Sequence, residues 1–405
     1  MTTSPMSTTP ITSALVRGAA ELEPTARGVR PHRLPSWVGR RFPDPQLLSM
    51  ESQPAGVRLV FRSRARRLEL ESHPARVGYR GVERPRGGID VFVDGELCLQ
   101  DALTGGDLTE IDLQTGSTAA VPGPSHSTVL EGLPEGEKLV EIWLPHNESL
   151  ELVELRSDAP LEPSAPAGPL WVHHGSSISQ GSNAAIPSGT WPAVAARLGG
   201  AELRNLGFGG SALVDPFLAR VIRDAPAELI SLAFGINVVN LDAMRLRAFV
   251  PAVHGFLDTV RDGHPDTPIL LVTPIFCDIH EHTPGPGAID PASFATGQAR
   301  FLATGTPGDE AFGRLTLTVI RRALREVVAR RSDDPQLHLL EGTALYGEED
   351  ARRLPLPDAL HPDAPTHQLI GERFARAAFG ASGPFAGAVG AVGASRAAGD
   401  SDERR

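Results

Sequence analysis

The spacing of hydrophobic residues changes along this chain, and that change limits the fold more than any other sequence feature. Between residues 57 and 158 apolar and polar residues tend to alternate, as in Ile89, Val91 and Val93. A period of two indicates β-strands, because successive side chains of a strand point to opposite faces. Asp94-Gly95 separates two such runs, and this pair accepts the positive φ angles of a tight hairpin turn.

Seven or so short strands with almost no helical stretch predict a β-sandwich of jelly-roll type over residues 31–160. The next segment, residues 161–169, reads LEPSAPAGP. Its prolines and glycine disfavour both a helix and the hydrogen-bonded ladder of a sheet. We therefore expect a linker between two domains.

Beyond the linker, five apolar runs alternate with helical patterns, and this alternation predicts a parallel sheet with helices on both faces. The runs are LWVHHG, ELRNLGF, LISLAFG, PILLVTPI and LHLLEGTAL. Helices are supported locally by the 3.6-residue spacing of apolar residues over 317–328 and by Thr190, which can cap the run that follows it. We expect an α/β/α domain over residues 170–380.

Composition narrows the class of protein. The 405 residues suffice for two domains, and the net charge of −11 without a basic block speaks against nucleic acid and anionic membranes as partners. The polar start lacks a secretory signal, and no apolar run is long enough to span a membrane. Cys98 and Cys277 make no metal-type spacing and are expected to be free thiols, which fits a cytoplasmic location. Residues 1–30 and 381–405 are expected to be disordered tails.

Three serines follow the first strand of the second domain, in WVHHGSSISQG. Reactive groups in an open α/β sheet collect beyond the carboxyl ends of the strands, which is where Ser176, Ser177 and Ser179 would lie. The segment does not match the Gly-x-Ser-x-Gly elbow of α/β-hydrolases. A serine-rich turn of this kind can equally be a helix cap or a phosphate-binding loop.

A glycine turn follows the second strand, in NLGFGGSA. Its glycines and Glu228 about 20 residues later loosely fit a dinucleotide fingerprint, although that fingerprint belongs to the first strand of a nucleotide unit. Alternatively, a glycine amide there could face a developing oxyanion. Asn237, after the third strand, is a good neutral donor to such a charge, or could bond its own backbone in a turn.

Asp358 and His361 lie three residues apart in a proline-bounded loop before the last helix. A nucleophilic serine needs a base near neutrality, and that base needs a carboxylate to fix its tautomer and stabilise its charged form. One loop can therefore supply both groups.

Taken in order, GSSIS, NLGFGGSA, GIN and DALHP resemble the four sequence blocks of the SGNH/GDSL hydrolase family over roughly residues 170–380. The resemblance implies a flavodoxin-like fold with Ser177 as nucleophile, His361 as base and Asp358 as its partner. It also implies an oxyanion hole made by the amides of Ser177 and Gly210 and the side chain of Asn237. No cofactor or metal is implied.

The sequence departs from the family pattern at two positions. Ser176 replaces the aspartate of Gly-Asp-Ser, and Val238 replaces an aspartate that often follows the block asparagine. Neither aspartate belongs to the triad. The sandwich resembles, more loosely, the jelly-roll domain of some two-domain carbohydrate esterases.

Several other features are interpreted as structural or as pocket-forming. Cys277–His282, which reads CDIHEH, lacks the spacing of a metal site. It opens a Gly- and Pro-rich loop over residues 276–312, which we expect to shape the pocket as a lid. His173 and His174 are expected to be structural, Trp171 to lie in the core, and Gln180 and Ser182 to reach substrate.

Together these features predict a serine esterase that removes short, acetyl-type O-acyl groups from a carbohydrate or small metabolite. The alternatives are an acyltransferase with the same site, a non-catalytic carbohydrate-binding protein and an NAD-linked oxidoreductase. The sequence does not predict the oligomeric state.

Overall fold

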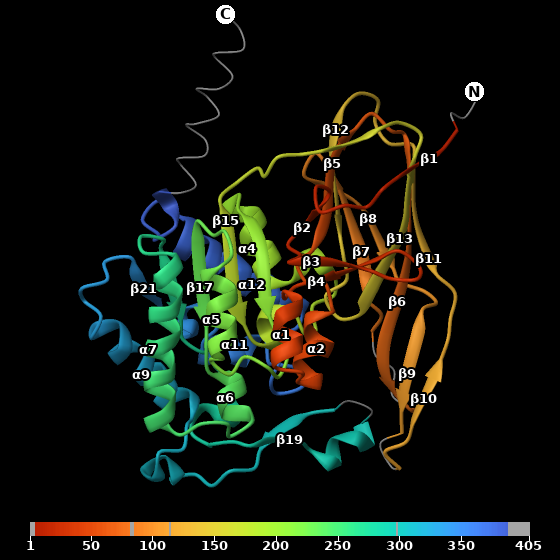
Figure 1. Ribbon diagram of the computed structural model, residues 1–405. Helices are drawn as coiled ribbons and strands as arrows, with labels where there is room; N and C mark the ends of the chain where they lie inside the picture. The colour runs from red at the N-terminus through yellow and green to blue at the C-terminus, as the bar shows by residue number, and fades with distance from the viewer. Residues whose placement is uncertain (1–4, 82–84, 113–114, 297–298, 388–405) are drawn as a thin grey trace, which may run out of the picture. The chain divides into compact units, whose positions relative to one another are not determined.

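The computed structural model describes residues 5–81, 85–112, 115–296 and 299–387. The described chain divides into two compact units, residues 5–165 with 186–188, and residues 166–185 with 189–387. The first unit is built mainly from strands, and the second alternates strands and helices (Figure 1). Among the described helices, none is both long enough and apolar enough to cross a membrane.

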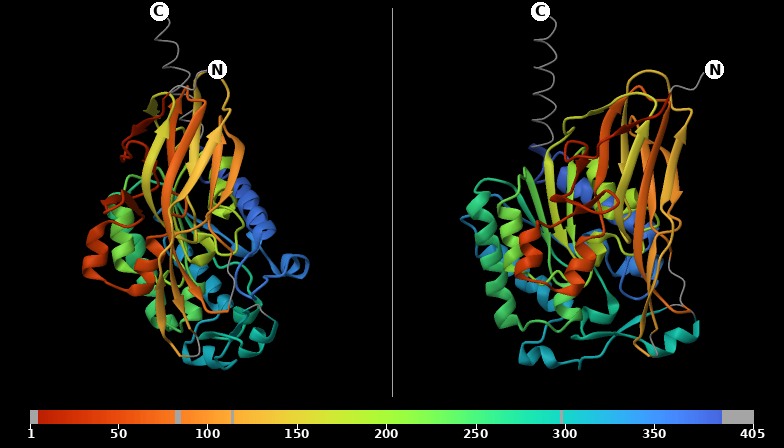
Figure 2. Two further views of the ribbon diagram at one scale, coloured as in Figure 1. Left: turned by 90° about the vertical axis from the view of Figure 1, so that its right-hand side faces the viewer. Right: turned by 45° about the vertical axis from the view of Figure 1, so that its right-hand side comes forward.

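In the first unit, the described strands form two sheets that face each other (Figure 2). One sheet has the order β10-β9-β6-β13-β4-β3, with β1 paired to β13 and β11 to β6. The other has the order β14-β5-β12-β7-β8, with β2 paired to β5. The elements are β1 (Ser7–Thr9), β2 (Val16–Arg17), β3 (Glu21–Pro24), β4 (Val29–His32), α1 (Ser36–Arg41), α2 (Pro45–Glu51), β5 (Arg58–Ser63), β6 (Arg67–Tyr79), β7 (Gly88–Val93), β8 (Glu96–Ala102), β9 (Asp107–Ile111), β10 (Thr118–Val121), β11 (His126–Glu131), β12 (Lys138–Trp143), β13 (Ser149–Ser157) and β14 (Leu161–Pro163).

The inward side chains of both sheets share one apolar core, which explains the alternation in the sequence. Leu68 and Leu70 of β6 and Val91 of β7 are buried in it. Asp94 and Gly95 have φ angles of 49° and 86° and connect β7 to the antiparallel β8. The predicted hairpin and the β-sandwich are therefore confirmed.

The N-terminal segment differs from the disordered tail predicted for residues 1–30. Its described part, residues 5–30, contains β1, β2 and β3 and the start of β4. Leu15 and Val16 lie in the core of the sandwich. The prediction is wrong for these residues because distant strands hold them by backbone pairing, which local composition does not reveal. Residues 1–4 lie outside the described residues.

The start of the linker predicted for residues 161–169 also differs from the prediction. Leu161–Pro163 forms strand β14, which pairs with β5 at the edge of its sheet. The expectation that proline would prevent ladder pairing is wrong here, because an edge strand can turn the missing N–H of proline away from its partner.

In the second unit, the main sheet is parallel and has the order β16-β15-β17-β18-β21. This is the 2-1-3-4-5 order of flavodoxin-like folds, so the predicted fold class is confirmed. The five predicted apolar runs form its strands, β15 (Leu170–Gly175), β16 (Glu202–Gly207), β17 (Leu229–Ala233), β18 (Ile269–Val272) and β21 (Leu337–Leu340). Its helices are α3 (Ser177–Gln180), α4 (Trp191–Gly199), α5 (Pro216–Arg223), α6 (Ile236–Asn240), α7 (Leu246–Gly263), α8 (Asp278–Glu281), α9 (Leu317–Ala329), α10 (Gly342–Leu345), α11 (Glu348–Arg353) and α12 (Ala364–Phe374).

Helices cover both faces of this sheet. On one face α5, α7 and α9 pack in a row, and on the other α4 packs against α12 (Figure 1). Side chains of the central strand β15 show the two faces, because Trp171 stacks on Phe374 of α12 whereas His174 stacks on Phe256 of α7. Thr190 occupies the N-cap position of α4, as predicted.

The C-terminal end of the unit extends further than the sequence predicts. A π-helical turn, Ala375–Phe379, follows α12, and Phe385 is fully buried against Phe379. The tail predicted for residues 381–405 is therefore wrong for this aromatic residue, since one phenylalanine finds a place in an aromatic cluster. Residues 388–405 lie outside the described residues.

Candidate active site

The predicted nucleophile lies where the central strand β15 ends. Ser176 is the N-cap of α3, and its hydroxyl accepts a hydrogen bond of 3.3 Å from the Ile178 amide. Ser177 is therefore the first residue of a helix at the carboxyl edge of the sheet. This edge is the topological switch point, because the chain continues from β15 to β16 on one side and then to β17 on the other. The serine that replaces the family aspartate thus caps the helix.

Two segments far apart in sequence meet at this edge. The Ser177 Oγ lies 2.9 Å from Nε2 of His361, and Nδ1 of His361 lies 2.7 Å from Oδ2 of Asp358. Because a carboxylate only accepts, Nδ1 carries the ring proton, and Nε2 is left to accept from the serine hydroxyl. All three side chains are largely buried, with Ser177 8% exposed.

The loop that carries Asp358 and His361 is held by its own backbone. Oδ1 of Asp358 accepts hydrogen bonds from the amides of Leu360, at 2.9 Å, and His361, at 2.7 Å. Between them Ala359 has a φ of 67°, a conformation that costs an alanine about 1 kcal/mol or more. The hydrogen bonds of Asp358 offset that strain and aim the carboxylate at the imidazole.

Asp358 stays anionic in this setting. Burial acts to raise its pKa, but the hydrogen bond from the His361 ring, the charge of that ring and the two loop amides outweigh burial and lower the pKa below its usual value. An anionic carboxylate is what a histidine base needs in order to become positively charged during the reaction.

The predicted oxyanion donors lie at the ends of the neighbouring strands. Gly210, after β16, has a φ of 70°, and Asn237 lies in α6 directly after β17. Oδ1 of Asn237 accepts from the Ala212 amide at 3.1 Å, which turns its NH₂ group away from that amide. Within the described residues, the amides of Ser177 and Gly210 and the Asn237 NH₂ have no hydrogen-bond partner.

Gln180 serves this glycine loop instead of reaching outward to substrate. Its side chain is buried, and its Oε1 accepts from the Gly209 amide at 2.8 Å. Together with Asn237 it holds the loop on both sides of Gly210. The sequence could have indicated this role, because Gln180 follows the nucleophile by three residues on the same short helix.

Glu228 does not fit the dinucleotide alternative. Its carboxylate accepts from the amide of Leu170 at the start of β15, at 2.9 Å. The glycine turn lies at the opposite, carboxyl end of the sheet, so Glu228 cannot reach a ribose bound there.

The histidines before the nucleophile are structural, as expected. Nδ1 and Nε2 of His173 contact the hydroxyls of Ser231 and Ser179, both at 2.7 Å, and His174 donates to the Leu206 carbonyl at 2.7 Å. Burial lowers the pKa of His173 to about 3 and that of His174 to about 4. Both rings are therefore neutral. Trp171 is fully buried, as predicted.

Three side chains of CDIHEH, those of Cys277, His280 and Glu281, bond to the protein itself. Glu281 forms a buried ion pair with Arg321, at 2.6 and 2.8 Å, and also accepts from the Cys277 amide. His280 contacts Asn240 and the Thr283 carbonyl. Among the described residues, no group of three or more His, Cys, Asp and Glu side chains is arranged to hold a metal ion. Both cysteines are free thiols, and burial raises the pKa of Cys277 far above its ordinary value.

The long segment 276–312 is not without structure. It contains α8, the two-stranded hairpin β19 (Gly287–Ile289) and β20 (Phe301–Ala303), and two 3₁₀ turns, Pro291–Thr296 and Asp309–Phe312. The Phe301 ring packs edge-on against the ring of His361, with 5.6 Å between centroids, and its amide donates to the Asp358 carbonyl at 2.8 Å. The segment thus borders the predicted base, while its function as a lid stays a prediction.

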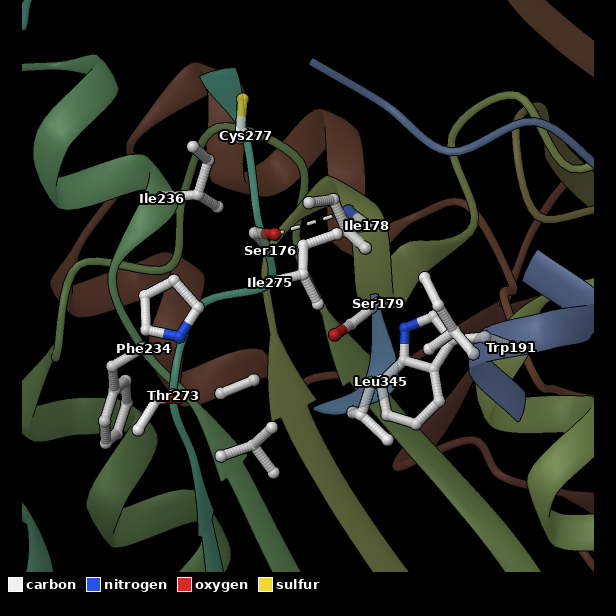
Figure 3. A pocket seen from close by; sticks show the side chains of 14 residues that line it. Ser176, Ile178, Ser179, Trp191, Phe234, Ile236, Thr273, Ile275, Cys277 and Leu345 are labelled. Atoms are coloured by element: carbon white, nitrogen blue, oxygen red, sulfur yellow. Dashed lines mark hydrogen bonds between the residues drawn. The ribbon is translucent and has the colours of Figure 1, made fainter. Parts of the chain in front are cut away.

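A cavity of about 50 Å³ lies beside the nucleophile turn, and Figure 3 shows the side chains around it. Ser176 and Ile178, the neighbours of Ser177 in sequence, line it, and so does Ile236, which precedes Asn237. Most of the other lining residues are apolar, among them Phe234, Val272 and Leu345. The cavity is therefore small and mostly apolar, and it is lined by sequence neighbours of Ser177 and Asn237 and not by these two residues themselves.

Comparison with known proteins agrees with this geometry. The sequence model of the GDSL-like lipase/acylhydrolase family matches residues 170–281. Over these residues the chain is similar to that family, as the four sequence blocks predict. The α/β/α unit and the β-sandwich agree with the fold class expected from the sequence. A comparison with curated proteins finds no match.

Solved structures extend the likeness to both units. A salicylyl-acyltransferase, SsfX3, from a tetracycline biosynthetic pathway is 29% identical with a TM-score of 0.75, over 91% of this chain and 95% of that one. A protein described as a GDSL-like lipase from Bacteroides ovatus is 19% identical with a TM-score of 0.63, over 91% and 96%. A family two carbohydrate esterase from Clostridium thermocellum is 16% identical with a TM-score of 0.52, over 79% and 91%. The last two likenesses concern the fold alone.

Proposed function

We propose that the protein is a serine esterase that works through an acyl-enzyme, with Ser177 as nucleophile, His361 as base and Asp358 as the partner of that base. The observation that carries the proposal is the 2.9 Å contact between the Ser177 hydroxyl and the unprotonated nitrogen of His361. A weak nucleophile such as serine is activated when an adjacent base can take its proton.

The reaction proceeds in two halves. Ser177 Oγ attacks the ester carbonyl carbon while its proton moves to Nε2 of His361, and the amides of Ser177 and Gly210 with the Asn237 NH₂ donate to the oxyanion. The bond to the alcohol oxygen then breaks, and the alcohol leaves with the proton from His361. Water next attacks the acyl carbon, gives a proton to His361, and the Ser177 oxygen leaves with that proton.

The acyl group is proposed to be short. The cavity next to the nucleophile turn is small and lined mostly by apolar side chains, and this favours a short acyl group. Its apolar wall suits a methyl or ethyl end. Leu345→Ala, which removes part of that wall, should raise the butyryl-to-acetyl ratio of kcat/KM several-fold. An unchanged ratio would indicate that the acyl group binds outside this cavity.

The direct test uses acetyl, butyryl and octanoyl esters with three proteins, namely wild type, Ser177→Ala and Ser332→Ala. Ser332 lies on an exposed turn of the same unit and controls for the loss of a hydroxyl. We expect hydrolysis of acetyl esters by the wild type and the control, and none above background by Ser177→Ala. Full activity of Ser177→Ala would reject the proposal.

Acyl transfer to an alcohol is the second candidate, and the likeness to the salicylyl-acyltransferase favours it. Both reactions share the acyl-enzyme and differ in what attacks it. Adding a series of alcohols at constant ester concentration separates them: a transferase gives mainly the new ester, whereas an esterase gives mainly the free acid.

The remaining sequence-based expectations are part of the same proposal. The alcohol would be a carbohydrate or a small metabolite, with neither nucleic acid nor a membrane as partner. Cell fractionation tests the expected cytoplasmic location.

A further inference from the structure

Asn183, which no sequence motif singled out, contacts the triad. The chain leaves α3 through Gly181, and Asn183 then adopts a φ of 64°. Asparagine tolerates this left-handed conformation better than most residues with a side chain. Although the residue is exposed, its Nδ2 donates to Oδ2 of Asp358 at 3.2 Å.

That hydrogen bond differs from the others that Asp358 accepts. The bonds from Leu360 and His361 come from the loop of Asp358 itself. Within the described residues, Asn183 is the donor to this carboxylate that comes from the turn of the nucleophile. It shares Oδ2, the same oxygen that accepts from the His361 ring.

A buried histidine fixes the turn on which Asn183 lies. Nε2 of His367, on α12, donates to the Ser182 carbonyl at 2.9 Å, while its Nδ1 accepts from the Trp191 amide at 3.2 Å. Burial lowers the pKa of His367 to about 4, so the ring is neutral and keeps this tautomer. The backbone at Ser182 is therefore held in place, and this limits the positions that the Asn183 side chain can take.

We propose that Asn183 is a positioning residue that ties the acid–base loop to the nucleophile turn by holding Oδ2 of Asp358 toward His361. The inference rests on the proposed function of the Ser177, His361 and Asp358 set. Without the Asn183 bond, the donors to the carboxylate that remain within the described residues all come from its own loop, and the nucleophile turn no longer holds Oδ2 in place.

The other groups near the Asp358–His361 pair would not obscure the effect of a charge introduced at position 183. His367 is neutral, Asp363 is engaged by the Thr366 amide and hydroxyl, and the Cys277 thiol donates to the Ala359 carbonyl. Phe301, on the remaining side, carries no charge. A new negative charge at position 183 would therefore act mainly on the Asp358–His361 pair.

The test compares wild type with Asn183→Asp, Asn183→Gly and a charge control, Gln368→Glu, which lies on the exposed side of α12. The readouts are kcat and KM for an acetyl ester across about pH 5 to 9 and the melting temperature. Asn183→Asp keeps the shape but sets a second carboxylate against Asp358, which favours the protonated imidazole. The acidic limb of kcat/KM should move up by roughly 0.5–1 pH unit.

Asn183→Gly keeps the backbone conformation and removes the donor, so kcat should fall roughly 3- to 30-fold with little change in KM or melting temperature. Gln368→Glu loses a surface bond to Glu372 but should keep the kcat and the acidic limb of the wild type. A purely structural residue would lower the melting temperature and leave the acidic limb in place. Coincident profiles for wild type and Asn183→Asp, or full kcat in Asn183→Gly, would overturn the inference. An active Ser177→Ala would instead overturn the proposed function.

Discussion

The two polar groups of the Asn237 side chain, Oδ1 and NH₂, have different roles. Oδ1 holds the glycine loop by accepting from the Ala212 amide, and the NH₂ group is free to donate to an oxyanion. Replacing Asn237 with alanine removes both. Loss of one oxyanion donor costs about 2.7–4 kcal/mol of transition-state stabilisation, which is on the order of 10²–10³ in kcat. Loss of the acceptor leaves a buried amide unpaired, at roughly 1–3 kcal/mol of folding stability.

Asn237→Asp keeps the acceptor and removes the N–H donor. The aspartate can still accept from Ala212, but its buried charge repels an oxyanion and itself lowers folding stability. We expect its kcat to fall at least as far as that of Asn237→Ala. The assay is steady-state hydrolysis of an acetyl ester, paired with urea unfolding. A kcat within threefold of wild type for either variant would refute the assignment of Asn237 to the oxyanion hole.

Three further predictions concern the triad, a buried ion pair and pH-dependent stability. Asp358→Asn should lower kcat on the order of 10³–10⁴-fold with little change in melting temperature, because the amide cannot hold the reactive tautomer. Glu281→Gln should cost about 3–5 kcal/mol in urea unfolding, since it leaves the buried Arg321 charge unbalanced, whereas Glu348→Gln in an exposed pair should cost less than about 0.5 kcal/mol. Hydrogen bonding to Glu51 raises the pKa of His32 despite the opposing effect of burial, so His32 stabilises the fold below its ordinary pKa and this contribution is lost as pH rises through the raised value. His32→Gln should therefore lower the melting temperature at pH 5.5 and leave it nearly unchanged at pH 8.5, and an equal loss at both would contradict this.

Sequence reasoning predicted those parts of the fold that depend on residues close together in the chain. The Asp94-Gly95 turn needs positive φ angles, and these two residues supply them. The five strands of the parallel sheet are continuous apolar runs, because both faces of the sheet are buried. The contact of Ser177 with His361 was predictable from the order of the sequence blocks, although Ser177 directly follows β15 whereas Asp358 and His361 lie in the loop after α11.

The parts that sequence reasoning missed depend on partners distant in the chain. The strands near the N-terminus pair with β5 and β13, and Phe385 completes an aromatic cluster around Phe379. Asn183 reads as an ordinary turn residue, and only folding brings it within 3.2 Å of Asp358, 175 residues away. Composition and periodicity carry no signal for such contacts.

Covalent labelling with a serine-reactive probe tests most directly whether His361 activates the Ser177 hydroxyl. Wild type, His361→Ala and Ser332→Ala are treated with a fluorophosphonate, digested and analysed by mass spectrometry. We expect one adduct, on the peptide that contains Ser177, in wild type and Ser332→Ala, and almost none in His361→Ala. An adduct on another serine, or full labelling of Ser177 without His361, would contradict the claim that this imidazole activates this hydroxyl.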